Sequence, residues 1–210
     1  MNLQRIRAFS LRWGAVIAFA LVVGNANALA ATALDQLIAR LSQFDQLHLR
    51  YFQVTLGDFT EQSAGEFLLK RPAQFKLIPD EGAIVLSDGE TLWTQDDLLA
   101  QVTAEPLDGV STFSPARLML MNLEEMDAAF EVQLVSDDGR SFMLTPKDQR
   151  ELIQSVRITF DSLSPVQITL VSRASQQVIV DLTVISVNQM IGGDEFTVEI
   201  GDGVDFVDYR

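Results

Sequence analysis

Apolar residues just beyond residue 30 recur at the three-and-four spacing that is typical of one face of a helix. This spacing predicts a helix over residues 33–47, with Thr32 or Asp35 placed to serve its N-terminus. Its apolar positions are Leu34, Leu37, Ile38, Leu41, Phe44 and Leu47. Further along, the period changes to two and stays there through most of the chain, which indicates a sheet with a few helices.

The alternating segments predict an antiparallel meander of strands joined by short turns. Asp88-Gly89 and Asp138-Gly139 lie between neighbouring segments, and Asp-Gly pairs favour hairpin turns. The predicted strands cover residues 49–56, 62–71, 75–78, 83–86, 91–94, 99–103, 130–135, 141–145, 153–161, 166–172, 177–187 and 195–200.

A second helical pattern interrupts the alternation over residues 108–129. Ser114-Pro115 begins it, because serine and proline favour the start of a helix. The apolar residues that follow are Leu118, Met119, Leu120, Met121, Leu123 and Met126. An apolar helical insertion can be an ordinary core lid, or, since methionine adapts to irregular partners, a ligand surface that repacks. With the first helix it would cover one face of an open sheet, so we predict a single, mainly β domain over residues 31–210.

The first 30 residues have the pattern of a secretory signal peptide. They contain Arg5, Arg7 and Arg12 and no acidic residue, and an apolar run follows at positions 13–23. That run is shorter than the roughly 20 residues that span a bilayer as a helix. Small residues offer two cleavage frames, Ala26-Asn27-Ala28 and Ala28-Leu29-Ala30, and we favour the second. We therefore expect a mature chain in the periplasm; the alternative is an uncleaved membrane anchor.

Charge and residue types narrow the classes of function. Without the signal peptide the formal net charge falls from 15 − 29 = −14 to 12 − 29 = −17. So acidic a chain is not expected to bind nucleic acid or anionic membranes. It has no Cys and one His, His48, which we interpret as a neutral surface or edge residue. The chain therefore has almost none of the Cys and His residues that form soft-metal sites and Ser-His or Cys-His nucleophile pairs. We expect no cofactor, no metal and no catalysis. Asp202 and Asp205 lack the spacing of a calcium loop, and we expect a solvated acidic tail there.

Several segments, in order, resemble one family. Residues 65–72 read Gly-Glu-Phe-Leu-Leu-Lys-Arg-Pro and are followed by Phe75, which resembles the Gly-x-x-x-x-Lys-Arg-Pro-x-x-Phe segment of LolA-type lipoprotein carriers. The further matches are Ser87-Asp88-Gly89-x-Thr91-Leu92-Trp93, Pro115-Ala116-Arg117-Leu118-Met119-Leu120, Leu144-Thr145-Pro146-Lys147, and Phe196 through Gly203-Val204-Asp205. Where the family usually has Phe-x-Gln after its first helix, this chain reads Tyr51-Phe52-Gln53, and Leu77 replaces the Trp of some members.

The resemblance implies an unclosed antiparallel β-barrel with a helical lid over an apolar cavity. It also implies a monomeric periplasmic chaperone that accepts acylated lipoproteins from an inner-membrane ABC transporter and delivers them to an outer-membrane receptor. The receptor role itself is not expected, because the related receptor is a lipoprotein and this chain has no Cys. The alternative function is that of a periplasmic lipid- or lipoprotein-sensing regulatory domain, since such a sensor shares the fold.

Arg71 is the most unusual candidate site residue. On an extended strand it shares a face with Phe67 and Leu69, and Phe75 and Leu77 continue the same parity beyond Pro72. A guanidinium among apolar residues needs acceptors, unless it extends into water at the sheet edge. The resemblance implies that Arg71 hydrogen-bonds the lid and gates the cavity. We expect Phe75 at the cavity mouth, in reach of water. The other expected lining residues are Phe113, Leu118, Met119, Met121, Ile158 and Phe160.

Overall fold

The computed structural model describes residues 31–107, 114–162 and 164–210, and Ala31–Arg210 forms one compact unit. A single sheet of 12 strands dominates it, in the order β12-β6-β5-β4-β3-β2-β1-β11-β10-β9-β8-β7. Its edges, β12 and β7, are not paired with each other, so the sheet is unclosed. All neighbours pair antiparallel except β12 and β6, which are parallel. The predicted mainly β, unclosed architecture is confirmed.

Most strands lie where the alternation predicts them. The strands are β1 (Gln46–Leu56), β2 (Thr60–Lys70), β3 (Gln74–Pro79), β4 (Ile84–Ser87), β5 (Thr91–Asp96), β6 (Gln101–Pro106), β7 (Phe130–Leu134), β8 (Ser141–Pro146), β9 (Ile153–Phe160), β10 (Pro165–Ser172), β11 (Gln177–Val187) and β12 (Asp205–Asp208). Gly89 and Gly139 both have positive φ, of 111° and 72°, in the turns β4–β5 and β7–β8. Both Asp-Gly turn predictions are therefore confirmed.

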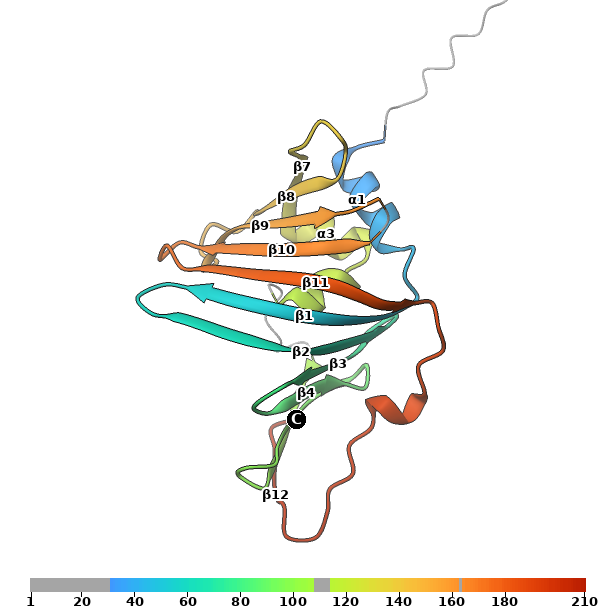
Figure 1. Cartoon of the computed structure of the whole chain (residues 1–210), viewed down its shortest axis with the longest axis vertical. Helices are drawn as coiled ribbons and strands as arrows, with labels where there is room; N and C mark the ends of the chain where they lie inside the picture. Colours follow the sequence, from blue (N-terminus) through green and yellow to red (C-terminus); the bar gives the residue numbers. More distant parts are fainter. Residues whose placement is uncertain (1–30, 108–113, 163) are drawn as a thin grey trace, which may run out of the picture. The chain divides into compact units, whose positions relative to one another are not determined.

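The helices are α1 (Ala33–Leu41), α2 (Pro115–Leu120), α3 (Leu123–Ala129) and a 3-10 helix, η2 (Gly193–Phe196). Figure 1 shows α1 and α3 behind the strands, on one face of the sheet. That face holds the main core, in which Leu37 of α1 and Leu118 of α2 pack with Leu49 and Phe67 of the strands. Burial of one face explains the two-residue period, because alternate side chains of a strand point to opposite faces. No helix within the described residues has the length and apolar character needed to cross a membrane.

The first helix is shorter than predicted. It begins with a capping box, in which Thr32 and Asp35 bond each other's backbone N–H groups, but it ends at Leu41 rather than Leu47. Asn188, at the end of β11, captures the chain that follows: its Oδ1 accepts from the N–H of Asp45 at 2.9 Å, and its Nδ2 donates to the carbonyl of Gln43 at 2.9 Å. These bonds turn the chain into β1. Phe44 and Leu47 continue the helical spacing in the sequence, but they are buried in a turn and in β1 rather than in a helix.

The insertion forms two helices, where the pattern predicted one helical run. Met121 leaves the helical conformation with ψ 138°, and Asn122 then caps α3, accepting from the N–H of Glu125. A capping residue immediately after α2 starts a new helix instead of extending the old one. Arg117 still joins them, because its Nη2 donates to Oε1 of Glu125 at 3.3 Å.

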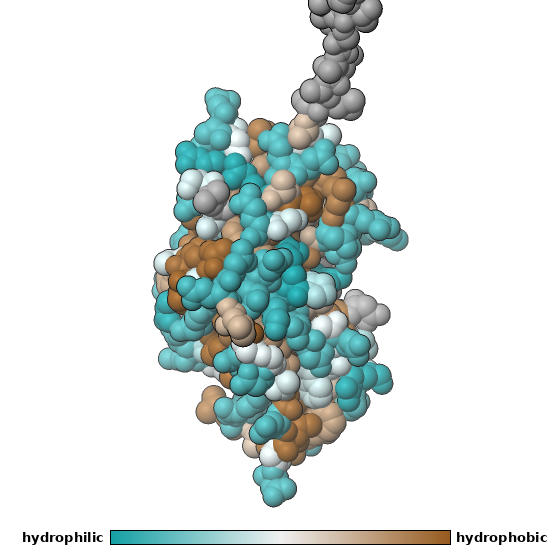
Figure 2. Space-filling view, turned by 90° about the vertical axis from the view of Figure 1, so that its right-hand side faces the viewer, coloured by the Kyte–Doolittle hydropathy of each residue, from teal (hydrophilic) through white to brown (hydrophobic). Residues whose placement is uncertain are grey.

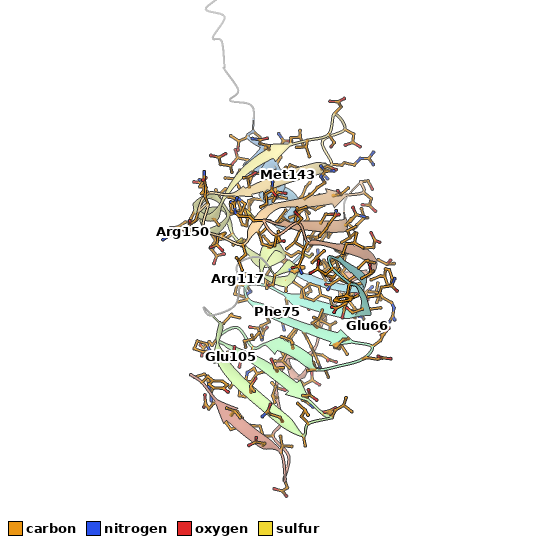
Figure 3. All side chains as sticks on the ribbon, turned by 90° about the vertical axis from the view of Figure 1, so that its left-hand side faces the viewer. Glu66, Phe75, Glu105, Arg117, Met143 and Arg150 are labelled. Carbon is orange, nitrogen blue, oxygen red and sulfur yellow. The ribbon has the colours of Figure 1, made fainter. Side chains whose placement is uncertain are left out.

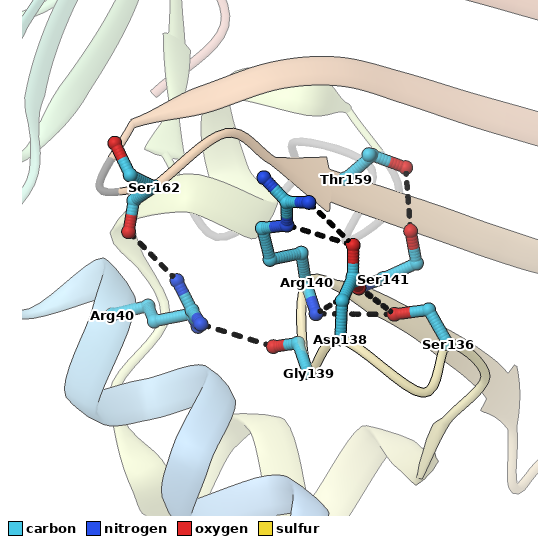
Figure 4. A network of polar contacts seen from close by, with 8 residues as sticks. All are labelled: Arg40, Ser136, Asp138, Gly139, Arg140, Ser141, Thr159 and Ser162. Atoms are coloured by element: carbon cyan, nitrogen blue, oxygen red, sulfur yellow. Dashed lines mark hydrogen bonds and ion pairs between the residues drawn. The ribbon is translucent and has the colours of Figure 1, made fainter.

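Arg40 fixes α1 to the sheet (Figure 4). Its Nη2 donates to the carbonyl of Gly139 at 3.0 Å, and its Nη1 donates to that of Ser162 at 3.4 Å. The guanidinium carbon also lies 5.4 Å from the ring centroid of Phe160 and 6.0 Å from that of Phe142. A cation over aromatic faces holds the end of α1 near the turns β7–β8 and β9–β10.

The C-terminal segment differs from the predictions in two places. The strand predicted at 195–200 is wrong: η2 stands at its start, and Phe196 is fully buried against Leu68 and Ile191 on the other face of the sheet. Asp202 and Asp205 are exposed, as expected of a solvated acidic tail, but the segment is not free of the sheet, since β12 pairs parallel with β6. A single strand's pattern cannot indicate which distant edge it will join. Figure 2 shows hydrophilic surface with separate hydrophobic patches on the side of α1 and this segment.

Candidate apolar binding cavity

An apolar cavity of about 410 Å³ lies between α2 and the inner face of the sheet. This volume is within the range of roughly 300–1,000 Å³ typical of small-molecule sites. Its lining comes from β1 to β5, β10, β11 and the start of α2. The lining residues are Tyr51, Gln53, Ser63, Phe67, Phe75, Leu77, Pro79, Glu81, Ala83, Val85, Leu92, Ser114, Pro115, Ala116, Met119, Ile168, Val180 and Leu182.

The aromatic part of the wall is built by the pairing of β2 with β3. Phe67 stands opposite Leu77, and Leu69 stands opposite Phe75. The rings of Phe67 and Phe75 are 6.5 Å apart between centroids. Phe75, labelled in Figure 3, lines the cavity but is only 3% exposed. The expectation that Phe75 reaches water at the mouth is therefore wrong, because its neighbours across the sheet and the lid cover its ring.

Helix α2, which we call the lid helix, covers the cavity. Ser114 caps it by accepting from the N–H of Arg117 at 3.1 Å, and Pro115 occupies its first turn. Serine and proline here favour a helix start because they satisfy or remove N–H groups that lack partners. The short helix directs Met119 into the cavity, while Leu118 is fully buried in the core. An unbranched thioether suits a wall that must repack.

Arg71 joins the lid helix to the end of β2. Its Nη1 donates to the carbonyl of Leu120 at 3.0 Å, and its Nη2 donates to those of Met119 and Leu41 at 2.8 Å each. Its Nε donates to the carbonyl of Phe44 at 2.9 Å. The predicted hydrogen bonds to the lid are confirmed, and the alternative of an Arg extending into water at the sheet edge is wrong. A gating role stays a prediction.

The electrostatics of this contact favour a closed lid. Leu41 and Leu120 are the last residues of α1 and α2, so their carbonyls lack partners within the helix and carry the negative end of its dipole. The guanidinium satisfies both of them. Burial lowers the pKa of Arg71 from its ordinary value, although the nearby Asp45 carboxylate opposes the shift. A cation held by four carbonyls stays charged and keeps its donors matched.

The structure brings only some of the predicted site residues together at the cavity. Phe67, Phe75, Leu77 and Met119 line it, and Arg71 does not line it but bonds the lid helix above it. The others belong to the buried core around it: Leu69, Leu118, Met121, Ile158 and Phe160. Phe113 lies outside the described residues.

Sequence reasoning missed the far wall and one polar end of the cavity. Ile168, Val180 and Leu182 form the wall on β10 and β11. The alternation of these strands marked them as inward-facing, but not which inward residues meet the lid. Tyr51 and Gln53 lie at the polar end, and their match to the family's Phe-x-Gln segment was a signal that could have found them.

Comparison with known proteins agrees with this architecture. The family model described as outer membrane lipoprotein carrier protein LolA matches residues 42–199. A curated outer-membrane lipoprotein carrier protein of Pseudomonas paraeruginosa is 27% identical over 199 residues, covering 91% of this chain and 95% of that protein. A protein of the same name from Hahella chejuensis is 30% identical, covering 87% of this chain and 90% of its own length.

Solved structures share the fold at low sequence identity. A LolA-superfamily protein of Nitrosomonas europaea has a TM-score of 0.50 at 15% identity, covering 80% of this chain and 99% of that structure. An uncharacterized conserved protein of Thermus thermophilus has a TM-score of 0.52 at 8% identity, covering 84% of this chain and 96% of that structure. The family model spans most of the chain and its curated relatives align over nearly their whole length, so this chain belongs to the LolA family of outer membrane lipoprotein carrier proteins.

Proposed function

We propose that this protein is a periplasmic chaperone that shields the acyl chains of lipoproteins in its apolar cavity. It accepts them from an inner-membrane ABC transporter and delivers them to an outer-membrane receptor. One observation carries the proposal beyond family membership. The lid over the apolar cavity is held by hydrogen bonds from Arg71 to Met119 and Leu120, so closure depends on a few polar contacts that can break when cargo is loaded.

The physical requirement of a carrier is reversible burial of apolar cargo. Each buried methylene contributes about 0.8 kcal/mol, so several fully shielded acyl chains would hardly dissociate. A lid that packs well when the cavity is empty opposes loading, since cargo must first break the lid contacts. The contacts of Arg71 and the packing of Met119 supply that opposition.

The size of the cavity with the lid helix in place fits a lid that cargo must displace. At about 410 Å³ it lies in the lower part of the range for ligand sites. A lipoprotein with several acyl chains needs more room. We infer that loading displaces the lid helix from the sheet and that closure follows release.

Other parts of the proposal rest on the sequence and on the family. We propose that residues 1–30 are a signal peptide removed on export, and that residues 31–210 act as a monomeric domain without a cofactor or catalytic activity. The named role of the curated relatives, outer-membrane lipoprotein carrier protein, supports the carrier function and the periplasmic location.

A transfer assay tests the proposal. The protein purified from the periplasm is loaded with a triacylated lipoprotein from transporter-containing proteoliposomes, and release to a membrane-anchored receptor is followed. We expect a soluble complex with the lipoprotein, and displacement of a bound hydrophobic dye by triacylated peptide. The unacylated peptide is the control and should displace no dye. Dye binding no stronger than that of an unrelated acidic protein, with no soluble complex, would disprove the carrier function.

A further inference from the structure

One end of the cavity is polar, unlike the rest of its wall. Phe67, Phe75 and Met119 are 5%, 3% and 2% exposed, so the lid end is apolar and closed. Toward the β1–β2 turn the same cavity is lined by Gln53, which is half-buried, and by the exposed Ser63. Exposed residues among the lining show that the cavity reaches the surface at this end.

The backbone pairing places these polar groups side by side. Gln53 stands opposite Ser63 across β1 and β2, and Tyr51 stands opposite Gly65 two residues further along. A Cβ on Gly65 would lie 2.9 Å from Cε1 of Tyr51 and would also collide with the carbonyl of Ile78. Glycine therefore lets the Tyr51 ring lie against β2, with its hydroxyl near the Ser63 side chain.

Tyr51 and Gln53 retain the capacity to bond a ligand. Burial raises the pKa of Tyr51 from its ordinary value, so its hydroxyl is neutral at physiological pH. This hydroxyl bonds the Ser63 side chain, and when the Ser63 hydroxyl donates in that bond, the Tyr51 O–H stays free to donate to a ligand. Gln53 donates from Nε2 to Oγ1 of Thr55 at a long 3.4 Å, and no other donor or acceptor among the described residues bonds its side chain. An amide has two donor hydrogens and a carbonyl acceptor, so most of this capacity is free.

We propose that Tyr51, Gln53 and Ser63 form a subsite for the ester and amide groups that join acyl chains to a lipoprotein. The acyl chains then extend toward Phe75 and Met119, and the peptide leaves the cavity past Glu81, which lines its exposed end. This inference rests on the proposed carrier function and adds an orientation of the cargo to it.

The chemistry of the linkage matches these side chains. Ester carbonyls are acceptors only, so the Tyr51 hydroxyl and the Gln53 amide N–H can donate to them. An amide-linked acyl chain also has an N–H, which the carbonyl of Gln53 can accept. A carbonyl drawn into an apolar cavity without a partner is penalised. A polar subsite at the rim lets the chains enter while the linkage keeps its hydrogen bonds.

Two matched ligands and two variants test the subsite. The ligands are a lipopeptide with ester-linked palmitoyl chains and its analogue with ether-linked hexadecyl chains, which lacks the ester carbonyls. Their affinities are measured by displacement of a hydrophobic dye from the full periplasmic protein and from Gln53→Leu. The expected result is a loss of about 3- to 10-fold for the ester ligand, the worth of one net hydrogen bond, and a change of less than about twofold for the ether ligand.

Tyr51→Phe repeats the test with minimal disturbance, because the ring stays and only the hydroxyl is removed. The same loss restricted to the ester ligand is expected. The matched control is Gln62→Leu, since Gln62 adjoins Ser63 on β2, is exposed and does not line the cavity. Gln62→Leu should alter neither the affinity for the ester ligand nor that for the ether ligand. Circular dichroism and dye affinity establish that each variant is folded with an intact cavity.

The possible outcomes separate this inference from the proposed function. If the parent binds both ligands and neither variant changes the ratio of their affinities, the subsite is wrong and the carrier function stands. Equal losses for both ligands also overturn it, since they indicate a general effect on the cavity. If the parent binds neither ligand, the proposed function fails, and the subsite fails with it.

Discussion

Nη2 of Arg71 lies 2.8 Å from the carbonyl oxygen of Met119, so the residue after β2 is bonded directly to the lid helix. Met119 also lines the cavity through its side chain. One residue thus contributes a carbonyl to the closing contact and a thioether to the ligand wall. We therefore predict that a ligand large enough to displace the lid helix breaks the contact with Arg71, which would couple cavity occupancy to lid position.

Replacing Arg71 by Leu should trap cargo. The variant loses hydrogen bonds to a charged group, worth about 1.5–3 kcal/mol, but also loses the cost of burying a cation, so we expect the melting temperature to shift by no more than about 5 °C. For cargo binding the two changes act in the same direction. Loss of the hydrogen bonds weakens the closed empty state, and the Leu side chain adds apolar surface that favours the loaded state. Arg71→Leu should accept lipoprotein and release it to the receptor several-fold more slowly in the transfer assay.

The matched control for this variant is Arg50→Leu. Arg50 pairs with Asp80 at 2.7 Å on the surface, and both side chains are about half exposed. Such a pair contributes roughly 0–1 kcal/mol. Transfer by this variant should equal that of the parent. If Arg71→Leu releases cargo as fast as the parent, the hydrogen bonds of Arg71 do not gate the cavity.

Phe75→Glu should destabilise the protein, because the Phe75 ring is buried. Loss of a large buried side chain costs about 3–5 kcal/mol, and the buried carboxylate adds to it. Phe75→Leu keeps an apolar side chain and should cost clearly less. Urea unfolding of both variants measures the difference. A free energy of unfolding for Phe75→Glu within about 1 kcal/mol of the parent would show that this side chain reaches water.

The same variant should show a defined pH dependence. Burial raises the pKa of an introduced Glu above its unfolded value of about 4.3, so the folded state binds more protons than the unfolded state. The free energy of unfolding then falls as pH rises through this range. Relative to the parent, Phe75→Glu should be less destabilised at pH 4.5 than at pH 8. An equal difference from the parent at both pH values would contradict burial of the carboxyl group.

Trp93 reports on the C-terminal strand. Phe206 of β12 stacks on it with centroids 6.1 Å apart, and Cζ of Arg210 lies 5.2 Å from its centroid. Trp93 is the sole Trp beyond residue 30, so its fluorescence is unambiguous in a processed chain. Phe206→Ser should shift its emission to longer wavelength and cost about 0.5–1.5 kcal/mol beyond the lost burial. Phe59→Ser, at an 84% exposed turn position, should do neither. Unchanged emission in Phe206→Ser would show that β12 does not dock in solution.

Asp208 should titrate well below an ordinary Asp. Hydrogen bonds from the side chain and then the backbone N–H of Arg210 lower its pKa from 3.8 to about 2. Because the folded pKa is the lower one, this stabilisation is present above about pH 4 and is lost as pH falls through about 2. Carboxyl carbon shifts measured by NMR give the midpoint, and Asp208→Asn identifies the resonance. A midpoint near 3.8 would mean that the contact with Arg210 is absent in solution.

The local sequence pattern was sufficient to predict an element, and its inward-facing residues, where one face of that element is buried along its length. The alternation of β2 assigned Phe67 and Leu69 to the inner face, because side chains of a strand take opposite faces in turn. Ser114-Pro115 located the start of the lid helix, since the preferences of a helix N-terminus are local. The same parity placed Arg71 near apolar residues and indicated that it needs acceptors.

Only the tertiary structure decided which distant groups meet. The first helix ends at Leu41 because Asn188 bonds Asp45, which lies 143 positions away in sequence. Phe75 is buried rather than at the mouth because other strands and the lid cover it, and its own strand pattern is the same in either case. Sequence thus determined the inward-facing residues and the family, through short-range periodicity and motif order. The ends of elements, the acceptors of Arg71 and the parallel edge strand were decided by long-range contacts, which local spacing does not encode.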